Sequence, residues 1–258
     1  MINSSTASNY ILLQGAMDSE IAVFLEMLEE ERTENICDFT FHIGKLLGVD
    51  VLVVKTFQGM VNAGACTILA IEHFHPKLII NQGICGGHDR GLHRGDVILG
   101  ETIINYGNVR ITPAKDSRPL DGCELIGVEA ICSQASSTVS FNDKTTLFYS
   151  DPKLLKKAQK ISVQFMEDNP GVAVATGRIG SADVWTDRVD YIDQLHAKFQ
   201  TSGEDMESAA VAQLCASYSI PFFSVRTISN TLVNQEDFDE STARTGQKFV
   251  AVLLSVEL

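Results

Sequence analysis

Small and polar residues gather in five short segments of this 258-residue chain, each directly after an apolar run. Small side chains let the backbone approach a ligand closely, so such segments are suited to binding and transforming a small molecule. Farther along, Glu204, Asp205 and Glu207 place three carboxylates within four positions, more than a helix cap requires, which indicates a chemical role. The five segments are residues 15–20, 58–63, 81–87, 180–185 and 226–230.

An alternating α/β pattern positions these segments. Short apolar runs alternate with stretches of helical apolar spacing, which predicts a single α/β domain with a mixed central sheet. In an open sheet of this class the ligand lies beyond the carboxyl ends of the strands, which is where the five segments fall. The expected strands are 10–13, 39–43, 51–54, 78–80, 97–104, 172–175 and 222–227; the expected helices are 20–31, 61–74, 152–165, 206–218 and 245–256; residues 107–124 are expected to form a long loop.

The composition argues against several classes of partner. Twenty basic and 33 acidic residues give a net charge of −13, which disfavours nucleic acid and anionic membranes because both attract basic surfaces. No apolar run approaches the ~20 residues of a membrane helix, and the beginning of the sequence lacks a signal-peptide pattern. We therefore expect a soluble cytoplasmic protein with one domain over residues 1–258, of which 1–9 form a flexible segment.

The cysteines and histidines predict no metal site. The six cysteines are scattered without a C-x-x-C pair, which is typical of buried thiols in a reducing compartment. His73 and His75 are two positions apart and would point to different faces of a helix. His88 and His93 lie in a glycine-rich segment without a cysteine or carboxylate at ligand spacing, so no metal is assigned.

Five motifs in a fixed order carry a family resemblance. They are G-A-M-x-x-E at 15–20, N-x-G-x-x-G-G at 81–87, S-x-D at 181–183, M-E-x-A-A-x-A at 206–212 and P-F-x-x-x-R-x-I-S at 221–229. Together they resemble the nucleoside phosphorylase superfamily, most of all its 5′-methylthioadenosine/S-adenosylhomocysteine nucleosidase branch of methionine salvage. The resemblance implies a twisted mixed sheet surrounded by helices, a homodimer, no metal or organic cofactor, and hydrolysis of the N-glycosidic bond of a purine nucleoside.

The resemblance also implies roles around the water and the ribose. Glu20 matches the carboxylate that activates the nucleophilic water; without the motif it would be an ordinary first-turn helix carboxylate, favoured by the helix dipole. Arg226 and Ser229 match polar residues after the last strand, and Glu20 is the expected partner of Arg226. Glu207 matches the carboxylate that binds the ribose hydroxyls, and Met206 the methionine packed under the ribose.

Further matches fall around the base and the 5′ group. Trp185, the single tryptophan, lies where the family has an aromatic residue stacked on the purine. Cys85 and Gly86 match residues whose backbone passes the base. Gln58 and Phe238 match positions of the pocket for the 5′ substituent, although Gln58 is polar where the family tends to be apolar.

Two departures keep alternatives open. Asn230 stands where the nucleosidases have an aspartic acid that protonates the departing purine, and an amide cannot transfer a proton at neutral pH. Ile84 replaces a serine or threonine of many members. Both favour a 6-oxopurine nucleoside hydrolase, similar to the futalosine hydrolases or acting on inosine, as the alternative. A purine nucleoside phosphorylase, or a binding or storage homologue with weakened catalysis, is the second alternative.

Overall fold

A ten-stranded mixed sheet runs through the part of the chain that the computed structural model describes, residues 8–112, 120–126 and 147–256. The strands follow the order β11-β10-β6-β12-β5-β1-β4-β3-β2, and β9 pairs with β6. They are β1 (Ile11–Gly15), β2 (Glu29–Ile36), β3 (Phe39–Leu46), β4 (Val49–Lys55), β5 (Leu78–Gly87), β6 (Val97–Asn105), β9 (Phe148–Tyr149), β10 (Val174–Ser181), β11 (Thr201–Asp205) and β12 (Phe222–Asn230).

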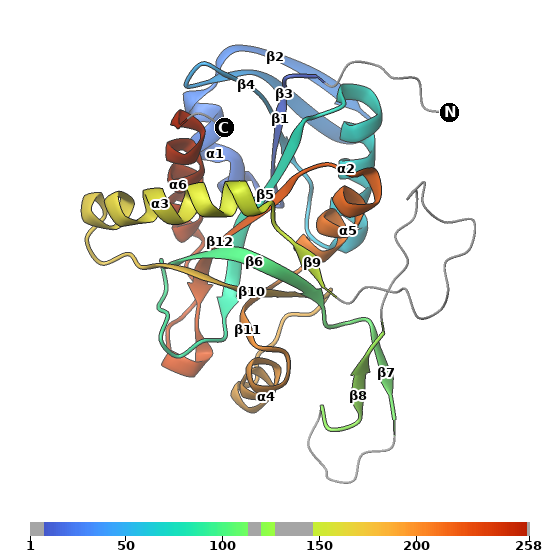
Figure 1. The fold of residues 1–258 in the computed structure, drawn as a ribbon, viewed down its shortest axis with the longest axis vertical. Helices are drawn as coiled ribbons and strands as arrows, with labels where there is room; N and C mark the ends of the chain where they lie inside the picture. The colour runs from blue at the N-terminus through green and yellow to red at the C-terminus, as the bar shows by residue number, and fades with distance from the viewer. Residues whose placement is uncertain (1–7, 113–119, 127–146, 257–258) are drawn as a thin grey trace.

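The sheet closes on itself at one end. Strand β11 pairs in parallel with β10 and in antiparallel with β5, so β5, β12, β6, β10 and β11 form a ring (Figure 1). Strands β1, β4, β3 and β2 extend the sheet away from this ring. A separate two-stranded hairpin is formed by β7 (Val109–Ile111) and β8 (Cys123–Leu125). The expected single α/β fold with a twisted mixed sheet surrounded by helices is confirmed.

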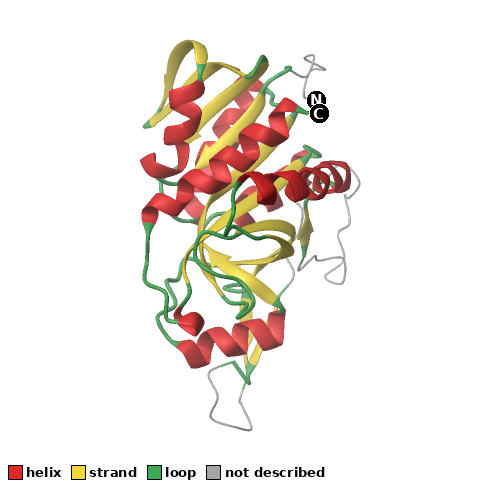
Figure 2. Ribbon diagram, turned by 90° about the vertical axis from the view of Figure 1, so that its left-hand side faces the viewer, coloured by secondary structure: helices red, strands yellow, loops and turns green. Residues whose placement is uncertain are grey.

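Helices cover both faces of the sheet and create two large apolar cores, and a smaller third core includes Leu195 and Phe199. The helices are α1 (Asp18–Met27), α2 (Met60–Phe74), α3 (Pro152–Asp168), α4 (Val189–Phe199), α5 (Ser208–Tyr218) and α6 (Ala243–Ser255). Successive strand residues point to opposite faces. Thus Leu12 packs in the core with α2 and α5, whereas Ile11 and Leu13 pack in the core with α1, α3 and α6 (Figures 1 and 2). Both faces are covered, which explains why the central strands are continuous apolar runs.

The strands that line the site are longer than the apolar pattern indicates. The sequence predicts that two of them end at Ile80 and Thr227, but β5 continues to Gly87 and β12 to Asn230. Their backbones keep pairing where the side chains become small or polar, because that stretch faces a pocket rather than a core. The 81–87 and 226–230 segments therefore belong to strands and are not loops after them.

Other expected elements also need correction. Helix α1 ends at Met27, and Glu29, expected in the helix, begins β2, whose exposed charged sequence has no apolar alternation to predict a strand. Helix α4 and strand β11 were not expected. The expected 107–124 loop contains β7 and the beginning of β8, and its residues 113–119 lie outside the described residues.

Three smaller expectations have mixed outcomes. Cys66, Cys85, Cys123 and Cys215 are buried as expected, Cys37 is exposed, and Cys132 lies outside the described residues. Residues 1–7 of the expected flexible segment also lie outside them, and Ser8 is hydrogen-bonded to the His75 carbonyl through its backbone N–H and its hydroxyl. Across the described ranges, none of the helices has the length and apolar content needed to span a membrane.

Candidate active site

One pocket brings together residues from seven separate parts of the chain. It lies where β1, β5, β11 and β12 end, as expected for the carboxyl edge of such a sheet. Ten of the eleven residues that the sequence nominates line it, and the eleventh, Arg226, is buried behind its wall. The ten are Glu20, Ile84, Cys85, Gly86, Trp185, Met206, Glu207, Ser229, Asn230 and Phe238, and Gln58 joins them.

Glu20 is a buried carboxylate held by backbone donors. It occupies the third position of α1, where Oε2 accepts the backbone N–H groups of Ala16 and Met17, as in a capping box. Its other oxygen, Oε1, accepts the backbone N–H of Ile84 on β5 at 2.7 Å. Burial raises the pKa of Glu20 above its ordinary value, although Arg226 and the three N–H groups oppose the shift. Glu20 thus caps the beginning of α1, as an ordinary first-turn carboxylate would, and is also available for chemistry in the pocket.

Glycine at position 83 lets this carboxylate approach β5. A Cβ on Gly83 would lie 2.5 Å from Glu20 Oε1 and 2.7 Å from Arg226 Nη1, well inside van der Waals contact. Gly15 is equally constrained, since its Cβ would meet the Glu20 side chain at 2.8 Å. These glycines are required by space rather than by an unusual backbone angle.

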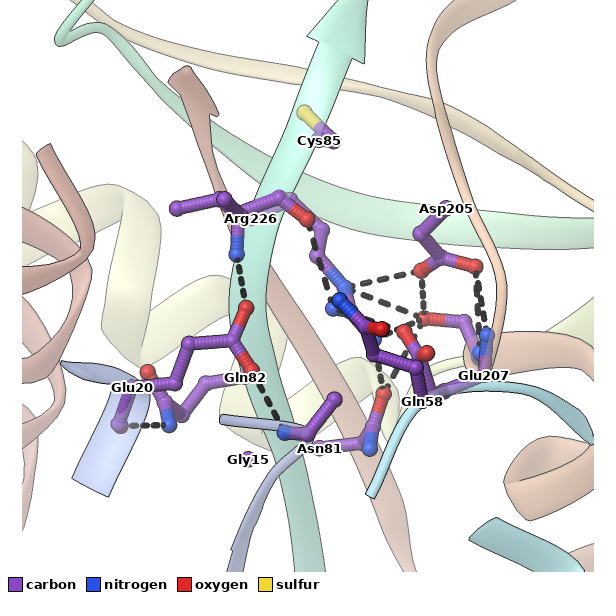
Figure 3. Close-up of polar contacts among 12 residues, drawn as sticks. Gly15, Glu20, Gln58, Asn81, Gln82, Cys85, Asp205, Glu207 and Arg226 are labelled. Carbon is purple, nitrogen blue, oxygen red and sulfur yellow. Dashed lines mark hydrogen bonds and ion pairs between the residues drawn. The ribbon is translucent and has the colours of Figure 1, made fainter. Parts of the chain in front are cut away.

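Arg226 is the cation at the centre of the site, and its principal partner is not the expected one. Its Nε lies 2.8 Å from Oδ2 of Asp205, and Nη1 lies 3.5 Å from Oε2 of Glu207 (Figure 3). Nη2 donates to Asn81 Oδ1 and to the Ser208 hydroxyl. The predicted pairing with Glu20 is therefore wrong as a direct contact, although the Arg226 charge still acts on Glu20 across the strand.

Asp205 is a site residue whose role the sequence analysis missed. Its Oδ1 accepts the backbone N–H groups of Glu207 and Ser208 as well as the Ser181 hydroxyl, and so satisfies the beginning of α5. Its Oδ2 is left to bind Arg226 and the hydroxyl of Ser208. The run of three carboxylates was the available signal, but it could not show that Asp205 faces the arginine.

The pKa of Glu207 is also raised. Burial, together with the negative charges of Asp205 and Glu20, raises its pKa from 4.5 to about 7, against the opposing effects of Arg226 and of the Gly59 N–H. Oε1 accepts that N–H at 3.0 Å. Glu207 and Met206 precede α5 instead of lying within the helix that the sequence predicts. A carboxylate at this edge can accept hydrogen bonds from the hydroxyl groups of a ligand.

Aromatic side chains border the open side of the pocket. The rings of Trp185 and Phe238 lie 5.5 Å apart in a tilted arrangement, and 61% of Trp185 and 44% of Phe238 are exposed. Gln58 lies beside them, with Nε2 3.4 Å from the Met17 sulfur. Such rings offer an apolar surface on which a flat ligand ring can stack as it approaches the buried carboxylates.

At the inner end of the pocket, polar side chains lie on both sides of Gly86. Asn230 lines one side, where its Oδ1 lies 2.9 Å from the Ser229 hydroxyl, which is also 3.1 Å from the Cys85 carbonyl oxygen. Glu204 lines the other side and was counted in the sequence only as part of a carboxylate run. Within the described ranges, no three His, Cys, Asp or Glu side chains are grouped so that they could hold a metal ion.

Comparisons with known proteins agree with this architecture. The family model described as the phosphorylase superfamily matches residues 10–256. A 5′-methylthioadenosine/S-adenosylhomocysteine nucleosidase of Geobacillus sp. (strain WCH70) is 26% identical over 251 residues, which cover 95% of this chain and 97% of the relative. The nucleosidase of the same name from Bacillus subtilis (strain 168) is 27% identical, with 84% of this chain and 83% of the relative covered.

Solved structures give the same picture. The Neisseria meningitidis 5′-methylthioadenosine/S-adenosylhomocysteine nucleosidase in complex with methylthio-immucillin-A superposes with a TM-score of 0.76 at 25% identity, covering 96% of this chain and all of that one. The Helicobacter pylori futalosine hydrolase has a TM-score of 0.75 at 19% identity, covering 97% of this chain and 99% of that one, and shows a shared fold.

Proposed function

The chain belongs to the phosphorylase superfamily, and on that premise we propose that it hydrolyses the N-glycosidic bond of a purine nucleoside. The observation that carries the proposal is the placement of Glu20. Its buried carboxylate lines the same pocket as Glu207 and the Trp185 ring, and its pKa is raised. A buried carboxylate of raised pKa is suited to accept a proton near neutral pH.

In the proposed reaction, Glu20 and Glu207 act on the water and the sugar, and Asn230 acts on the base. Water held by Glu20 attacks C1′ of the ribose as the bond from C1′ to the purine nitrogen breaks, and Glu20 takes the proton of the water. The sugar becomes cationic on the way, as in glycoside hydrolysis, and the carboxylate of Glu207 both stabilises that charge and holds the hydroxyl groups. The purine leaves with the bonding electron pair and takes a proton from solvent, while the Asn230 amide donates a hydrogen bond to it. Glu20 returns the proton of the attacking water to solvent, so that the reaction balances.

Water is favoured over phosphate as the nucleophile by the charges of the site. Glu20, Asp205 and Glu207 surround one arginine, and Arg226 is 1% exposed and bound to Asp205 and Ser208. Ile84 supplies no hydroxyl, and residues 15–20 contain no arginine. An incoming dianion would therefore meet carboxylates rather than free cations, which argues against the phosphorylase alternative.

Two substrate classes are candidates. The curated relatives are named for 5′-methylthioadenosine and S-adenosylhomocysteine, so thionucleosides of adenine are the first. The second is a 6-oxopurine nucleoside, favoured by Asn230, because an amide at this position replaces a proton donor. The presence of Glu20, Glu207 and Arg226 in one arrangement argues against a binding or storage homologue that has lost turnover.

Assembly and location follow from the same resemblance. A homodimer is part of the proposal, supported by the exposure of Trp185, Val184 and Phe238 beside the pocket, since large apolar side chains clustered on a surface are typical of interfaces. Light scattering coupled to size-exclusion chromatography should give twice the mass of the 28.2 kDa chain. A cytoplasmic location is proposed with it.

Base release in phosphate-free buffer tests the function. Chromatography of reactions with 5′-methylthioadenosine, S-adenosylhomocysteine, adenosine and inosine should show a free purine and a reducing sugar from at least one nucleoside. In H₂¹⁸O the sugar should gain one heavy oxygen at C1′. Strict dependence on added phosphate would support the phosphorylase instead, and no purine from any nucleoside at high enzyme concentration would refute the enzyme proposal.

A further inference from the structure

Gly86 is flanked in the sheet by two polar residues at matched positions. On one side, Glu204 of β11 is its register partner, and on the other side Asn230 of β12 is. A Cβ on Gly86 would lie 3.5 Å from Glu204 Cγ, 3.8 Å from Glu204 Oε1 and 4.0 Å from Asn230 Oδ1. Both side chains thus converge over the glycine, and all three residues line the pocket. The missing side chain leaves a slot between a carboxyl group and an amide.

Glu204 presents an ionised carboxylate to this slot. It is 8% exposed, and Oε2 accepts the hydroxyl groups of Tyr106 at 2.7 Å and Thr186 at 2.8 Å. The His88 ring nitrogen Nε2 lies 3.4 Å from the same oxygen. Burial opposes ionisation, but the nearby His88 ring and the hydrogen bonds from Tyr106 and Thr186 outweigh it and hold the pKa of Glu204 below its ordinary value. A carboxylate in this state accepts hydrogen bonds and donates none.

Glu204 also accepts the hydrogen bonds of Thr186, which lines the same side of the pocket. The backbone N–H of Thr186 donates to Oε1 at 3.0 Å, and the Thr186 hydroxyl donates to Oε2. Thr186 lines the pocket directly after Trp185, but both of its donors are directed at the carboxylate. Oε1 retains a second lone-pair direction. A base edge placed against this side of the pocket must therefore bring an N–H of its own.

We propose that Glu204 and Asn230 together select a 6-oxopurine base, of the hypoxanthine or guanine type, over a 6-aminopurine. This proposal rests on the proposed hydrolysis of purine nucleosides and names the base that the slot accepts. A 6-oxopurine carries a hydrogen on N1 that Glu204 can accept, and an adjacent oxygen that can accept from the Asn230 amide. Adenine has a lone pair at N1, which would face the carboxylate and leave a buried acceptor against a negative charge.

Binding of the free bases tests the proposal without turnover. Trp185 is the single tryptophan and lines the pocket, so quenching of its fluorescence reports the dissociation constants of hypoxanthine and adenine for the wild-type protein. Hypoxanthine should bind at least ~10-fold more tightly, because a site built to accept an N–H rejects an analogue that lacks it. Equal or tighter binding of adenine would overturn the proposal, whether or not any nucleoside is hydrolysed.

A charge-removing substitution identifies the residue responsible. For the wild type, kcat/KM should be higher for 5′-methylthioinosine than for 5′-methylthioadenosine, a pair that differs only in the base. Glu204→Gln should reduce this ratio by ~10–10²-fold, since the amide can donate to N1 of adenine. An unchanged ratio in a folded variant would overturn the role of Glu204.

A neighbouring variant controls for disturbance of the network. Tyr106→Phe removes one donor to Oε2, but both Thr186 donors and the His88 ring remain to keep Glu204 ionised, and Oε1, the oxygen nearest the slot, is unchanged. It should lower the melting temperature while keeping the ratio of the two substrates within ~2-fold of wild type, well short of the ~10-fold change expected for Glu204→Gln. A ratio change as large as that of Glu204→Gln would attribute the effect to general disorder and overturn the proposal. If Glu204→Gln does not fold, the wild-type dissociation constants decide the question alone.

Discussion

Carboxylates occur in two contrasting regions of this protein, the edge strand β2 and the pocket wall. In β2, Glu30 and Glu34 are exposed to solvent and pair with Lys45 at 3.0 Å and Arg32 at 4.0 Å. In the pocket, Asp205 and Glu207 are at most 5% exposed and share Arg226. Exposed pairs in water contribute little, whereas buried charges interact strongly and shift one another's protonation.

The contrast shows that residue type alone does not make a carboxylate reactive. The net charge of −13 combines solvated groups such as those of β2 with a few buried groups whose pKa values are raised. Burial by the sheet, one shared arginine and backbone N–H donors convert ordinary acids into candidate catalysts. The same substitution should therefore have a large effect in the pocket and little effect in β2.

The largest effect is expected from Arg226→Met. Removal of the central cation leaves Asp205 and Glu207 buried without their counter-charge, which should lower the free energy of unfolding by about 3–5 kcal/mol and abolish turnover. Urea titration followed by circular dichroism measures the loss. Arg32→Met is the matched control, since Arg32 is 63% exposed, and its unfolding midpoint should not change. Equal midpoints for the two variants would show that burial does not distinguish the regions.

Glu20→Gln should act on catalysis rather than on folding. The amide keeps the shape of the side chain but cannot accept the proton of water, so kcat should fall by ~10²–10⁴-fold. Base binding measured by Trp185 fluorescence should stay within ~3-fold, which is less than 1 kcal/mol of binding free energy. Glu30→Gln on β2 is the exposed counterpart and should leave kcat unchanged. Full turnover in Glu20→Gln would remove this residue from the mechanism.

Gly83→Ala should damage the site without removing a charge. The added methyl would collide with Glu20 and Arg226 at once, so both must shift, and kcat should fall by at least ~10-fold because small misplacements of catalytic groups are costly. Gly64→Ala in α2 is a fitting control, since its Cβ would meet only Leu214 at an ordinary 3.8 Å. Comparable kcat values for the two variants would contradict the close approach at Gly83.

The smallest effect is a gain in stability from Glu207→Gln. The pKa of Glu207 is raised to about 7, so between pH 4.5 and 7 the folded state binds more protons than the unfolded state, and stability falls as pH rises through this window. At pH 8 the variant should melt ~2–4 °C above wild type, the equivalent of about 1 kcal/mol for a chain of this size. The difference should shrink as the pH falls and vanish below pH 4.5, where Glu207 is protonated in both the folded and the unfolded states. A lower melting temperature at pH 8 would show that the ionised group stabilises the fold.

Much of the site could be predicted because its motifs are local. The segment that ends in Glu20 and the one that carries Met206 and Glu207 are short, and each places its chemical group at the beginning of a helix, where the structure also has it. Strand ends were harder to predict. Apolar patterning reports burial in a core, so it stopped at Ile80 and Thr227 although β5 and β12 continue.

Partners across the sheet could not be predicted from spacing. Arg226 and Asp205 are 21 positions apart, and nothing in either segment shows that β11 curves back to pair with β5 and faces the arginine. The same closure brings Glu204 beside Asn230 over Gly86. From the sequence, Glu20 was the plausible partner of Arg226 because both match one family site, but backbone N–H donors occupy Glu20 instead.

The sequence by itself determined the α/β class, the family and the residues that gather at the pocket, because apolar periodicity and short motifs are written along the chain. The tertiary structure alone decided which carboxylate pairs with Arg226, which one has its pKa raised to about 7 and which one faces the base. These properties depend on burial and on distances between strands remote in sequence. Coulombic energies and desolvation change steeply with both, so they exist only once the ring of strands has closed.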